Sequence, residues 1–316
     1  MVTWIKDPAV VWTGNKERAS RGVLVSGGRI LELVGEFPRV EYDEVFDASG
    51  LVLIPGLINC HHHFYQTLTR ALPAALNKEL FPWLASLYPV WSNLTDESVR
   101  ASTRTAVCEL MLSGCTTTVD HHYVFSKALS RAIDVQAEEI KSLGIRAILT
   151  RGSMSLSKEN GGLPPSSVVQ TEDVILKDSE RLIDRWHDHS EGAMLQIALA
   201  PCSPFSVTEE LMSTSAQLAR EKKVLLHTHL AETSDENSFC ENLYGCRPLD
   251  YLEKVGWLSS YVWLAHGIHF SSEEIQRLGR SKTGICHCPS SNMTLASGFC
   301  PVEELRAAGA PVGLGV

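Results

Sequence analysis

Apolar segments alternate with amphipathic segments from residue 51 to the end of the sequence. Eight apolar runs have the length of strands: Leu51–Cys60, Cys115–Asp120, Arg146–Arg151, Leu195–Cys202, Val224–His229, Tyr261–His266, Gly284–Cys288 and Pro311–Val316. Stretches with apolar residues at helical spacing lie between them: Asp96–Ser113, Leu129–Leu143, Glu172–Trp186, Glu209–Glu221, Leu249–Val255, Glu273–Leu278 and Val302–Ala308. Strands that are buried on both faces have continuous apolar runs. The pattern therefore predicts an α/β fold with a closed parallel (β/α)8 barrel of the TIM type.

An open, doubly wound parallel sheet is the alternative architecture. That fold places a glycine-rich phosphate loop between an early strand and its helix. No such motif opens a helix in this sequence. The barrel is therefore favoured, and its functional residues are expected at the carboxyl ends of the strands.

The first 50 residues carry shorter strand patterns. They are Thr3–Ile5, Val10–Trp12, Val23–Ser26, Arg29–Val34 and Glu44–Phe46. Gly27 and Gly28 predict a tight hairpin turn, because paired glycines adopt the positive φ angles that such a turn needs. This β layer is too thin to be stable alone. We predict two domains: residues 1–54 form part of a small β-sandwich, and residues 55–316 form the barrel.

Composition narrows the function classes. The 316 residues are 44% hydrophobic, and the net charge is 28 − 37 = −9 without any basic run, which argues against a nucleic-acid partner. The nine cysteines lack the spacing of a disulfide framework, which indicates a reducing compartment. No signal peptide or apolar run of about 18 residues is present. We expect a cytoplasmic protein without a membrane partner, and a homo-oligomer is compatible with the sequence.

Histidines cluster at the predicted strand ends. Nine of the 12 lie there: His61, His62, His63, His121, His122, His227, His229, His266 and His269. His61 and His63 alternate, so at the end of a strand both imidazoles project to the same side, as two ligands of one metal ion must. Cys286-His287-Cys288 is a weaker candidate for a structural zinc site, because it lacks a second Cys/His pair at zinc-finger spacing.

The strand-end motifs resemble those of the amidohydrolase superfamily, in its purine and pterin deaminase and triazine hydrolase branch. The matching segments are Pro55-Gly56-Leu57-Ile58-Asn59-Cys60-His61-His62-His63, His229-Leu230-Ala231-Glu232 and Ala265-His266. Further segments are similar to 8-oxoguanine deaminases: His62 to Arg70, Thr150 to Met154 and Cys286 to Met293. The resemblance covers the whole chain, and it implies that the N-terminal strands join a C-terminal segment in the sandwich.

The resemblance implies a set of metal ligands and catalytic residues. His61, His63 and His229 would bind one Zn²⁺, with iron as the alternative ion. The ion would lower the pKa of a bound water from about 15.7 towards 7. Glu232 would carry the proton from this water to the ring nitrogen and the leaving amine, and His266 would polarise the attacking oxygen. Without a metal, Glu232 would simply belong to a solvated acidic cluster.

The resemblance to the superfamily also implies that the site holds a single ion. Two-metal members of the superfamily carry a carbamylated lysine at the end of the fourth strand, and here that strand ends at Ala200-Pro201-Cys202. Lys222 and Lys223 precede the fifth strand and are expected at the opposite rim of the barrel.

Four residues are candidate substrate contacts. Gln66 resembles the glutamine that this branch directs at its substrate, and an amide can donate to and accept from a purine edge. Arg151 could bind a carbonyl or an anionic ring, although a structural ion pair is the alternative. His122 and Tyr123 could line the pocket. Trp83, Tyr88 and Trp91 form either a flap or ordinary helix packing.

One family residue is missing from the printed sequence. The superfamily places an aspartate at the end of the eighth strand, directly after the position of Val316, where the sequence stops. The last barrel helix and half of the sandwich are absent as well. Either the sequence is a fragment of a longer product, which we expect, or the polypeptide truly ends at Val316. As written, the chain is expected to fold poorly and hydrolyse slowly, since it would expose apolar surface and open strand edges.

Three functions remain open. The first is hydrolytic deamination of a purine, either 8-oxoguanine to urate and ammonia or guanine. The second is hydrolysis of a triazine or another aminoheterocycle, which needs the same attack on an aromatic carbon. The third is a non-catalytic metal-binding protein, although such a protein has no need of Glu232 and His266.

Overall fold

The structure is a computed structural model that describes residues 1–14 and 18–316. It divides into two compact units. One contains Met1–Leu57 with Ser190–Gly192, and the other contains Ile58–His189 and Ala193–Val316. The domain division at residue 54 stays a prediction, although the first unit ends nearby.

The N-terminal unit is built from short strands. Its strands are β1 (Thr3–Lys6), β2 (Val10–Val11), β3 (Gly22–Ser26), β4 (Arg29–Leu33), β5 (Glu44–Asp47) and β6 (Val52–Leu53). Four of them form a sheet in the order β4-β3-β1-β5, and β2 pairs with β6. Gly27 and Gly28 have φ angles of 56° and 75°, and β3 and β4 pair antiparallel around them, so the predicted hairpin is confirmed.

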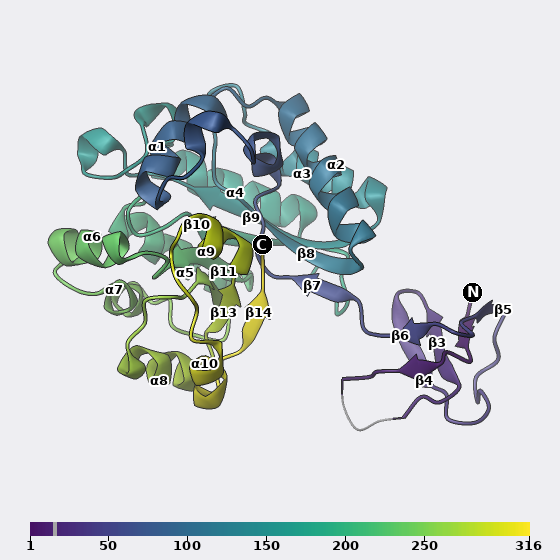
Figure 1. Ribbon diagram of the computed structural model, residues 1–316. Coiled ribbons are helices and arrows are strands. Elements are labelled where there is room, and N and C mark those ends of the chain that lie inside the picture. The colour runs from purple at the N-terminus through teal and green to yellow at the C-terminus, as the bar shows by residue number, and fades with distance from the viewer. Residues whose placement is uncertain (15–17) are drawn as a thin grey trace. The chain divides into compact units, whose positions relative to one another are not determined.

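The second unit contains the barrel (Figure 1). Its strands are β7 (Leu57–Asn59), β8 (Cys115–His122), β9 (Arg146–Ser153), β10 (Leu195–Pro201), β11 (Leu226–Leu230), β12 (Val262–His266), β13 (Gly284–His287) and β14 (Val312–Leu314). They are neighbours in sequence order from β7 to β14. The outer strands meet through two backbone hydrogen bonds, Cys60 N–H to Leu314 O at 2.8 Å and Val316 N–H to His61 O at 3.1 Å. The predicted (β/α)8 barrel is confirmed, and it is nearly closed.

Helices surround this sheet (Figure 1). They are α1 (Leu80–Trp91), α2 (Asp96–Leu112), α3 (Ala132–Leu143), α4 (Glu172–Trp186), α5 (Glu209–Lys222), α6 (Ser234–Tyr244), α7 (Pro248–Lys254), α8 (Ser272–Ser281), α9 (Pro289–Thr294) and α10 (Val302–Ala308). Short 3-10 turns occupy Phe64–Thr69, Pro73–Ala75, Lys158–Asn160 and Ser166–Val168. The Thr95 hydroxyl accepts from Ser98 N–H and begins α2, and Gly144, at φ 77°, ends α3. No helix within residues 1–14 and 18–316 is long and apolar enough to cross a bilayer.

The structure corrects the sequence prediction at a few elements. Leu51–Cys60 is not one strand, because it breaks at Pro55 into β6 and β7. Proline lacks an N–H group and restricts the residue before it, so it interrupts a central strand. Helices α1, α6 and α9 were not predicted. Helix α6 begins Ser-Asp-Glu-Asn-Ser, so its first turns have no apolar periodicity, and α1 contains Pro89.

Candidate metal centre and active site

Three imidazoles converge at the carboxyl ends of the barrel strands. His61 and His63 follow β7, and His229 lies in β11. The Nε2 atom of His63 is 3.1 Å from Nε2 of His61 and 3.1 Å from Nε2 of His229. Two nitrogens that each lie about 2.1 Å from a tetrahedral ion are about 3.4 Å apart. The spacing therefore fits three nitrogen ligands around one ion.

Backbone carbonyl groups set the orientation of two of these rings. The Nδ1–H of His63 donates to His121 O at 2.6 Å, and the Nδ1–H of His229 donates to Cys202 O at 2.7 Å. A carbonyl oxygen only accepts hydrogen bonds, so the proton of each neutral ring is on Nδ1 and the lone pair of Nε2 is free. Free Nε2 lone pairs are what a metal ion requires, and carbonyl partners of this kind are typical of ligating histidines.

The third ring is oriented through another histidine. His227 Nδ1–H donates to Trp263 O at 2.8 Å, which leaves His227 Nε2 as an acceptor. The Nδ1–H of His61 donates to that Nε2 at 2.7 Å, so the Nε2 of His61 also keeps its lone pair. This role of His227 was not predicted from the sequence. The alternation of His227 and His229 in one strand, which places both on the same face, was the available signal.

His121 is a fourth imidazole in the same group. One of its nitrogens and a nitrogen from each of His61, His63 and His229 all lie within 4.8 Å of one another. Its Nε2–H donates to Ala200 O at 3.0 Å, and its ring stacks on that of His229 with centroids 4.6 Å apart. Its buried Nδ1 has no hydrogen-bond partner among the described residues. The structure thus adds His121 to the surroundings of the three predicted ligands.

Burial keeps these imidazoles neutral. It is the largest cause that lowers the pKa of His61, His63 and His121 well below the usual value, and the neighbouring histidines lower it further. Burial also lowers the pKa of His229 to about 3. A neutral imidazole is the form that binds metal, so the donor set fits a zinc ion. The ligand roles of His61, His63 and His229 themselves remain predictions.

Glu232 and His266 face each other beside this cluster. Both side chains are buried, and Glu232 Oε2 lies 3.4 Å from His266 Nε2. Burial raises the pKa of Glu232 to about 8 and lowers the pKa of His266 to about 4. A carboxyl group with a pKa near neutrality can both take up and release a proton, as a proton carrier must.

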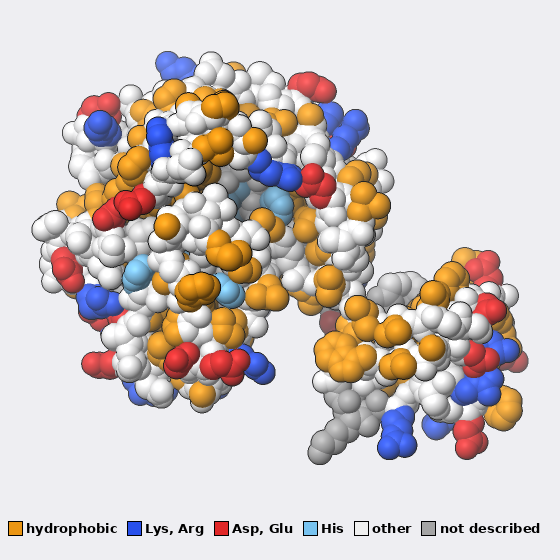
Figure 2. All heavy atoms as spheres, in the orientation of Figure 1, with side chains coloured by type: hydrophobic (Ala, Val, Ile, Leu, Met, Phe, Trp, Pro, Cys, Tyr) orange, Lys and Arg blue, Asp and Glu red, His pale blue; other side chains and the backbone are white. Residues whose placement is uncertain are grey.

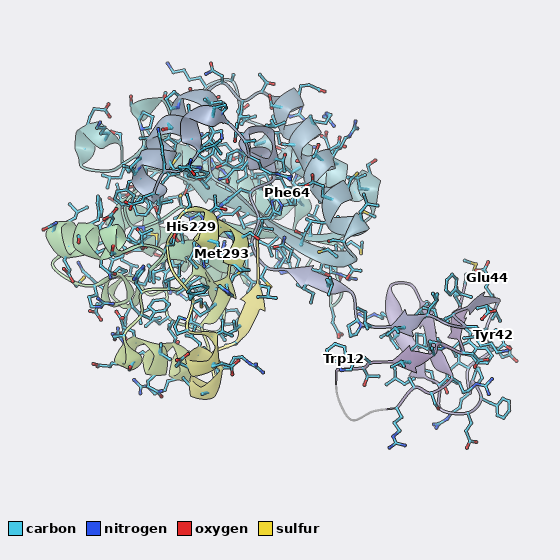
Figure 3. All side chains as sticks on the ribbon, viewed as in Figure 1. Trp12, Tyr42, Glu44, Phe64, His229 and Met293 are labelled. Atoms are coloured by element: carbon cyan, nitrogen blue, oxygen red, sulfur yellow. The ribbon has the colours of Figure 1, made fainter. Side chains whose placement is uncertain are left out.

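A cavity of about 560 Å³ opens onto the cluster. Gln66 and Tyr123, two of the predicted substrate contacts, line it together with the three predicted ligands, Glu232 and His266. Figure 2 shows histidine side chains at the base of a hollow in this face, and Figure 3 labels His229 near the centre of the barrel. Gln66 Nε2 lies 3.4 Å from the Tyr123 hydroxyl. The metal cluster, the proton carrier and these polar side chains therefore share one cavity.

The structure does not bring His122 and Arg151 to this cavity. Neither lines it, and both are buried elsewhere. The Nε2–H of His122 donates to Val124 O at 2.8 Å. Arg151 pairs with Asp178 at 2.6 Å and stacks on the Phe125 ring at 3.7 Å, as expected for the structural alternative. Neither side chain is therefore placed to contact a substrate in this cavity.

The aromatic residues of α1 and the cysteines on either side of His287 are the remaining candidates from the sequence. Tyr88 and Trp91 are fully buried, which fits helix packing, whereas Trp83 lines the cavity. Cys288 has its Sγ within 4.8 Å of nitrogens of His61 and His266. Cys288 thus lies beside the histidine cluster, and its Sγ is 4.0 Å from that of Cys286. Among the described residues, no metal-binding group joins these two cysteines with His287.

A second buried carboxyl group supports the backbone at Glu232. Glu236 is fully buried and its Oε2 accepts from Glu232 N–H at 3.0 Å, while its Oε1 has no partner among the described residues. Burial is the largest cause that raises the pKa of Glu236 from 4.5 to about 8. The folded chain therefore holds this proton in a pH range where the unfolded chain has released it. Stability should fall as the pH rises through this range.

Glu236→Gln should flatten this pH dependence in the metal-free chain. Glutamine keeps an acceptor for Glu232 N–H but cannot ionise. At about pH 8 we expect the variant to unfold at least about 2 °C above the parent, which corresponds to about 1 kcal/mol, and at about pH 5 we expect no gain. Thermal unfolding with a chelator measures the effect. Glu241→Gln, at an exposed position of α6, is the control. If the unfolding temperature of the variant falls as steeply with pH as that of the parent, the buried Glu236 carboxyl group is not the cause of the pH dependence.

Known proteins match both the sequence and the fold. The amidohydrolase family model matches residues 52–316. An 8-oxoguanine deaminase from Pseudomonas aeruginosa is 58% identical over 99% of this chain and 70% of its own length. A hydroxydechloroatrazine ethylaminohydrolase from Pseudomonas sp. (strain ADP) is 35% identical over 93% of this chain and 63% of its own length.

The structural comparison agrees with the sequence comparison. A crystal structure of an atrazine chlorohydrolase from Arthrobacter aurescens TC1, complexed with zinc, superposes with a TM-score of 0.91 at 28% identity. The match covers all of this chain and 71% of that one. The relatives are hydrolytic enzymes of heterocycles, which supports an aminohydrolase. The family match and the identities show that the chain belongs to the amidohydrolase family, as its strand-end motifs predicted.

Proposed function

We propose that the protein hydrolyses the exocyclic amine of 8-oxoguanine, giving urate and ammonia, with guanine as a second substrate. The 58% identity with an 8-oxoguanine deaminase favours this substrate among the heterocycles. The observation that carries the chemistry is Glu232, placed in one cavity with three converging imidazoles. A cytoplasmic location and a small-molecule partner are consistent with this activity and stay predictions.

His61, His63 and His229 would hold one zinc ion, with iron as the alternative. When bound, such an ion lowers the pKa of water so that hydroxide is available at neutral pH. The protein's part is to present three neutral Nε2 lone pairs, and the carbonyl groups of His121 and Cys202 hold two of the rings in that state.

Glu232 is the proposed proton carrier. It takes one proton from the attacking water and gives it to the ring nitrogen. When the bond between the ring carbon and the exocyclic nitrogen breaks, it passes the second proton, from the added hydroxyl group, to the leaving amine, which departs as ammonia. Its raised pKa suits both steps, because the group neither holds its proton too tightly nor remains ionised throughout. His266, 3.4 Å from Glu232, would accept a hydrogen bond from the attacking oxygen or from the carboxyl group.

Gln66 and Tyr123 are the proposed contacts for the ring. The Gln66 side chain lines the cavity, and its amide oxygen can accept a hydrogen bond from an N–H group on a purine edge. Tyr65 and Tyr123 lie next to it, with both hydroxyl groups 3.4 Å from Gln66 Nε2. These phenols hold the amide in place and leave its oxygen for the ligand.

Ammonia release tests the substrate. The zinc-loaded chain should release ammonia from 8-oxoguanine faster than from guanine, and should release none from aminotriazines. Formation of urate, followed by its ultraviolet absorbance, identifies the product. The second candidate function, an aminotriazine hydrolase, is suggested by the relatives that act on triazines. Release from aminotriazines without release from either purine would replace our proposal by that one.

A further inference from the structure

His266 forms a hydrogen bond with a buried side chain on the side of its ring that faces away from Glu232. The Nδ1 atom of His266, at the end of β12, lies 2.8 Å from Oδ1 of Asn292 in α9. The Asn292 side chain is 1% exposed and that of His266 is 3% exposed, so water does not compete for this contact. Figure 3 labels the next residue of α9, Met293, which is exposed. The helix therefore turns Asn292 towards the barrel and Met293 towards solvent.

The two ends of the Asn292 amide have different partners. Its Oδ1 faces His266, and its Nδ2 lies 3.5 Å from Nδ1 of His287. In this orientation the amide oxygen accepts from His266 and the amide N–H donates to His287. An amide oxygen cannot donate, so the proton of the neutral His266 ring must be on Nδ1.

This proton position determines what His266 offers to the cavity. With the proton on Nδ1, the Nε2 atom that faces Glu232 at 3.4 Å carries a lone pair. It can then accept a hydrogen bond from the Glu232 carboxyl group or from water. With the proton on Nε2, the same atom would only donate, and it could not take a proton from either group.

The backbone conformation of His266 also indicates that its ring is held in a fixed position. His266 has a φ angle of 74°, a left-handed conformation that costs a residue other than glycine about 1 kcal/mol or more. Gly267 continues the turn at a φ of 61°, and its N–H donates to Leu230 O at 3.1 Å. A strained backbone persists only where its surroundings hold it, and the Asn292 contact is part of these surroundings.

We propose that Asn292 is a positioning residue that fixes His266 as the Nδ1–H tautomer and so directs the Nε2 lone pair at Glu232. The tautomer stands on the geometry alone. Only its consequence for turnover rests on the proposed function.

Nitrogen NMR of the metal-free chain, labelled with ¹⁵N-histidine, reports this tautomer directly. The spectrum of His266→Gln identifies the two signals of the ring. In the parent chain, Nδ1 should have the shift of a protonated nitrogen and Nε2 that of an unprotonated one. Asn292→Ala should move the ring towards the Nε2–H form. Asn292→Asp should keep the Nδ1–H form, because a carboxylate only accepts. Met293→Leu is the control on the same helix and should change neither signal.

Two results would overturn the inference: an Nε2–H ring in the parent chain, or an unchanged ring in Asn292→Ala. If Asn292→Ala does not fold, the spectrum of Asn292→Asp provides the test. A His266 ring that changes its tautomer in Asn292→Asp cannot have donated from Nδ1 to the native amide oxygen, and this result would overturn the inference. For turnover, Asn292→Ala should lower kcat about 10- to 100-fold with little change in KM, and Asn292→Asp should restore most of it. An inactive parent chain leaves the tautomer result standing and contradicts only the proposed function.

Discussion

Replacing His63 with alanine should abolish stable zinc binding. The Nε2 atom of His63 lies 3.1 Å from both other predicted ligand nitrogens, so its loss leaves two of the three predicted ligands. Loss of an outer hydrogen-bond partner alone weakens metal affinity about 10- to 100-fold, so loss of a ligand should weaken it by more than about 100-fold. Zinc per chain after dialysis, measured by mass spectrometry, tests this. The parent chain should keep about one equivalent.

The neighbouring histidine provides the control for this experiment. His62 lies between the two ligands but does not belong to the group of four histidines, and its ring packs 5.2 Å from that of Phe64. His62→Ala should therefore keep zinc. A parallel check is thermal: excess zinc at about 1,000 times its Kd should stabilise the parent chain by about 4 kcal/mol and leave His63→Ala unaffected. Zinc retained by His63→Ala, or lost from His62→Ala, would contradict the ligand assignment.

Glu232→Gln should stop turnover without removing the metal. Glutamine has almost the same shape but cannot carry a proton, and a positioned acid or base contributes about 100- to 10,000-fold to the rate. We therefore expect ammonia release to fall at least about 100-fold while the zinc content stays unchanged. Glu232 is not one of the three predicted ligands, so the substitution should change the rate of ammonia release and not the zinc content.

The control for this substitution is Glu241→Gln, on the exposed face of α6. It makes the same replacement of a carboxyl group by an amide but lies outside the cavity, so its turnover should match the parent. Full activity in Glu232→Gln would show that another group moves the proton. A zinc-loaded parent chain that releases no ammonia from any heterocycle would favour the non-catalytic metal-binding alternative.

The barrel could be predicted because its strands have a simple signature. Parallel strands that are buried on both faces are apolar at nearly every position, and the run Leu195–Cys202, with Gln196 as its one polar residue, shows this directly. Two predicted helices, α4 and α10, also have the bounds found in the structure. Helix α6 could not be found in this way, because its buried residues are Glu236 and Cys240, and a buried carboxyl group does not contribute to a hydrophobic pattern.

The site was predicted less completely, for reasons of strand geometry. His122 and Tyr123 are adjacent, and neighbours in a strand point to opposite faces, so they could not both face the cavity. The structure turns His121 and Tyr123 towards the histidine cluster and His122 away from it. Arg151 likewise points outward to Asp178 of α4. Deciding which face is inside requires the register between strands, which one strand's sequence does not contain.

The partners of the histidines were beyond sequence analysis for another reason. Asn292 reaches His266 from a short helix that the hydrophobic pattern did not predict, and His227 reaches His61 across the barrel. Such pairs join positions far apart in the sequence, and no local pattern encodes them.

The carbonyl groups that hold the cluster have a consequence for how the protein can evolve. His63, His227 and His229 each donate to a main-chain oxygen, at positions 121, 263 and 202. Every amino acid supplies that oxygen, so mutations at these three positions leave the protonation pattern of the rings intact as long as the strands keep their register. This pattern is inherited through the path of the backbone, and the surrounding side chains are free to diverge towards new substrates.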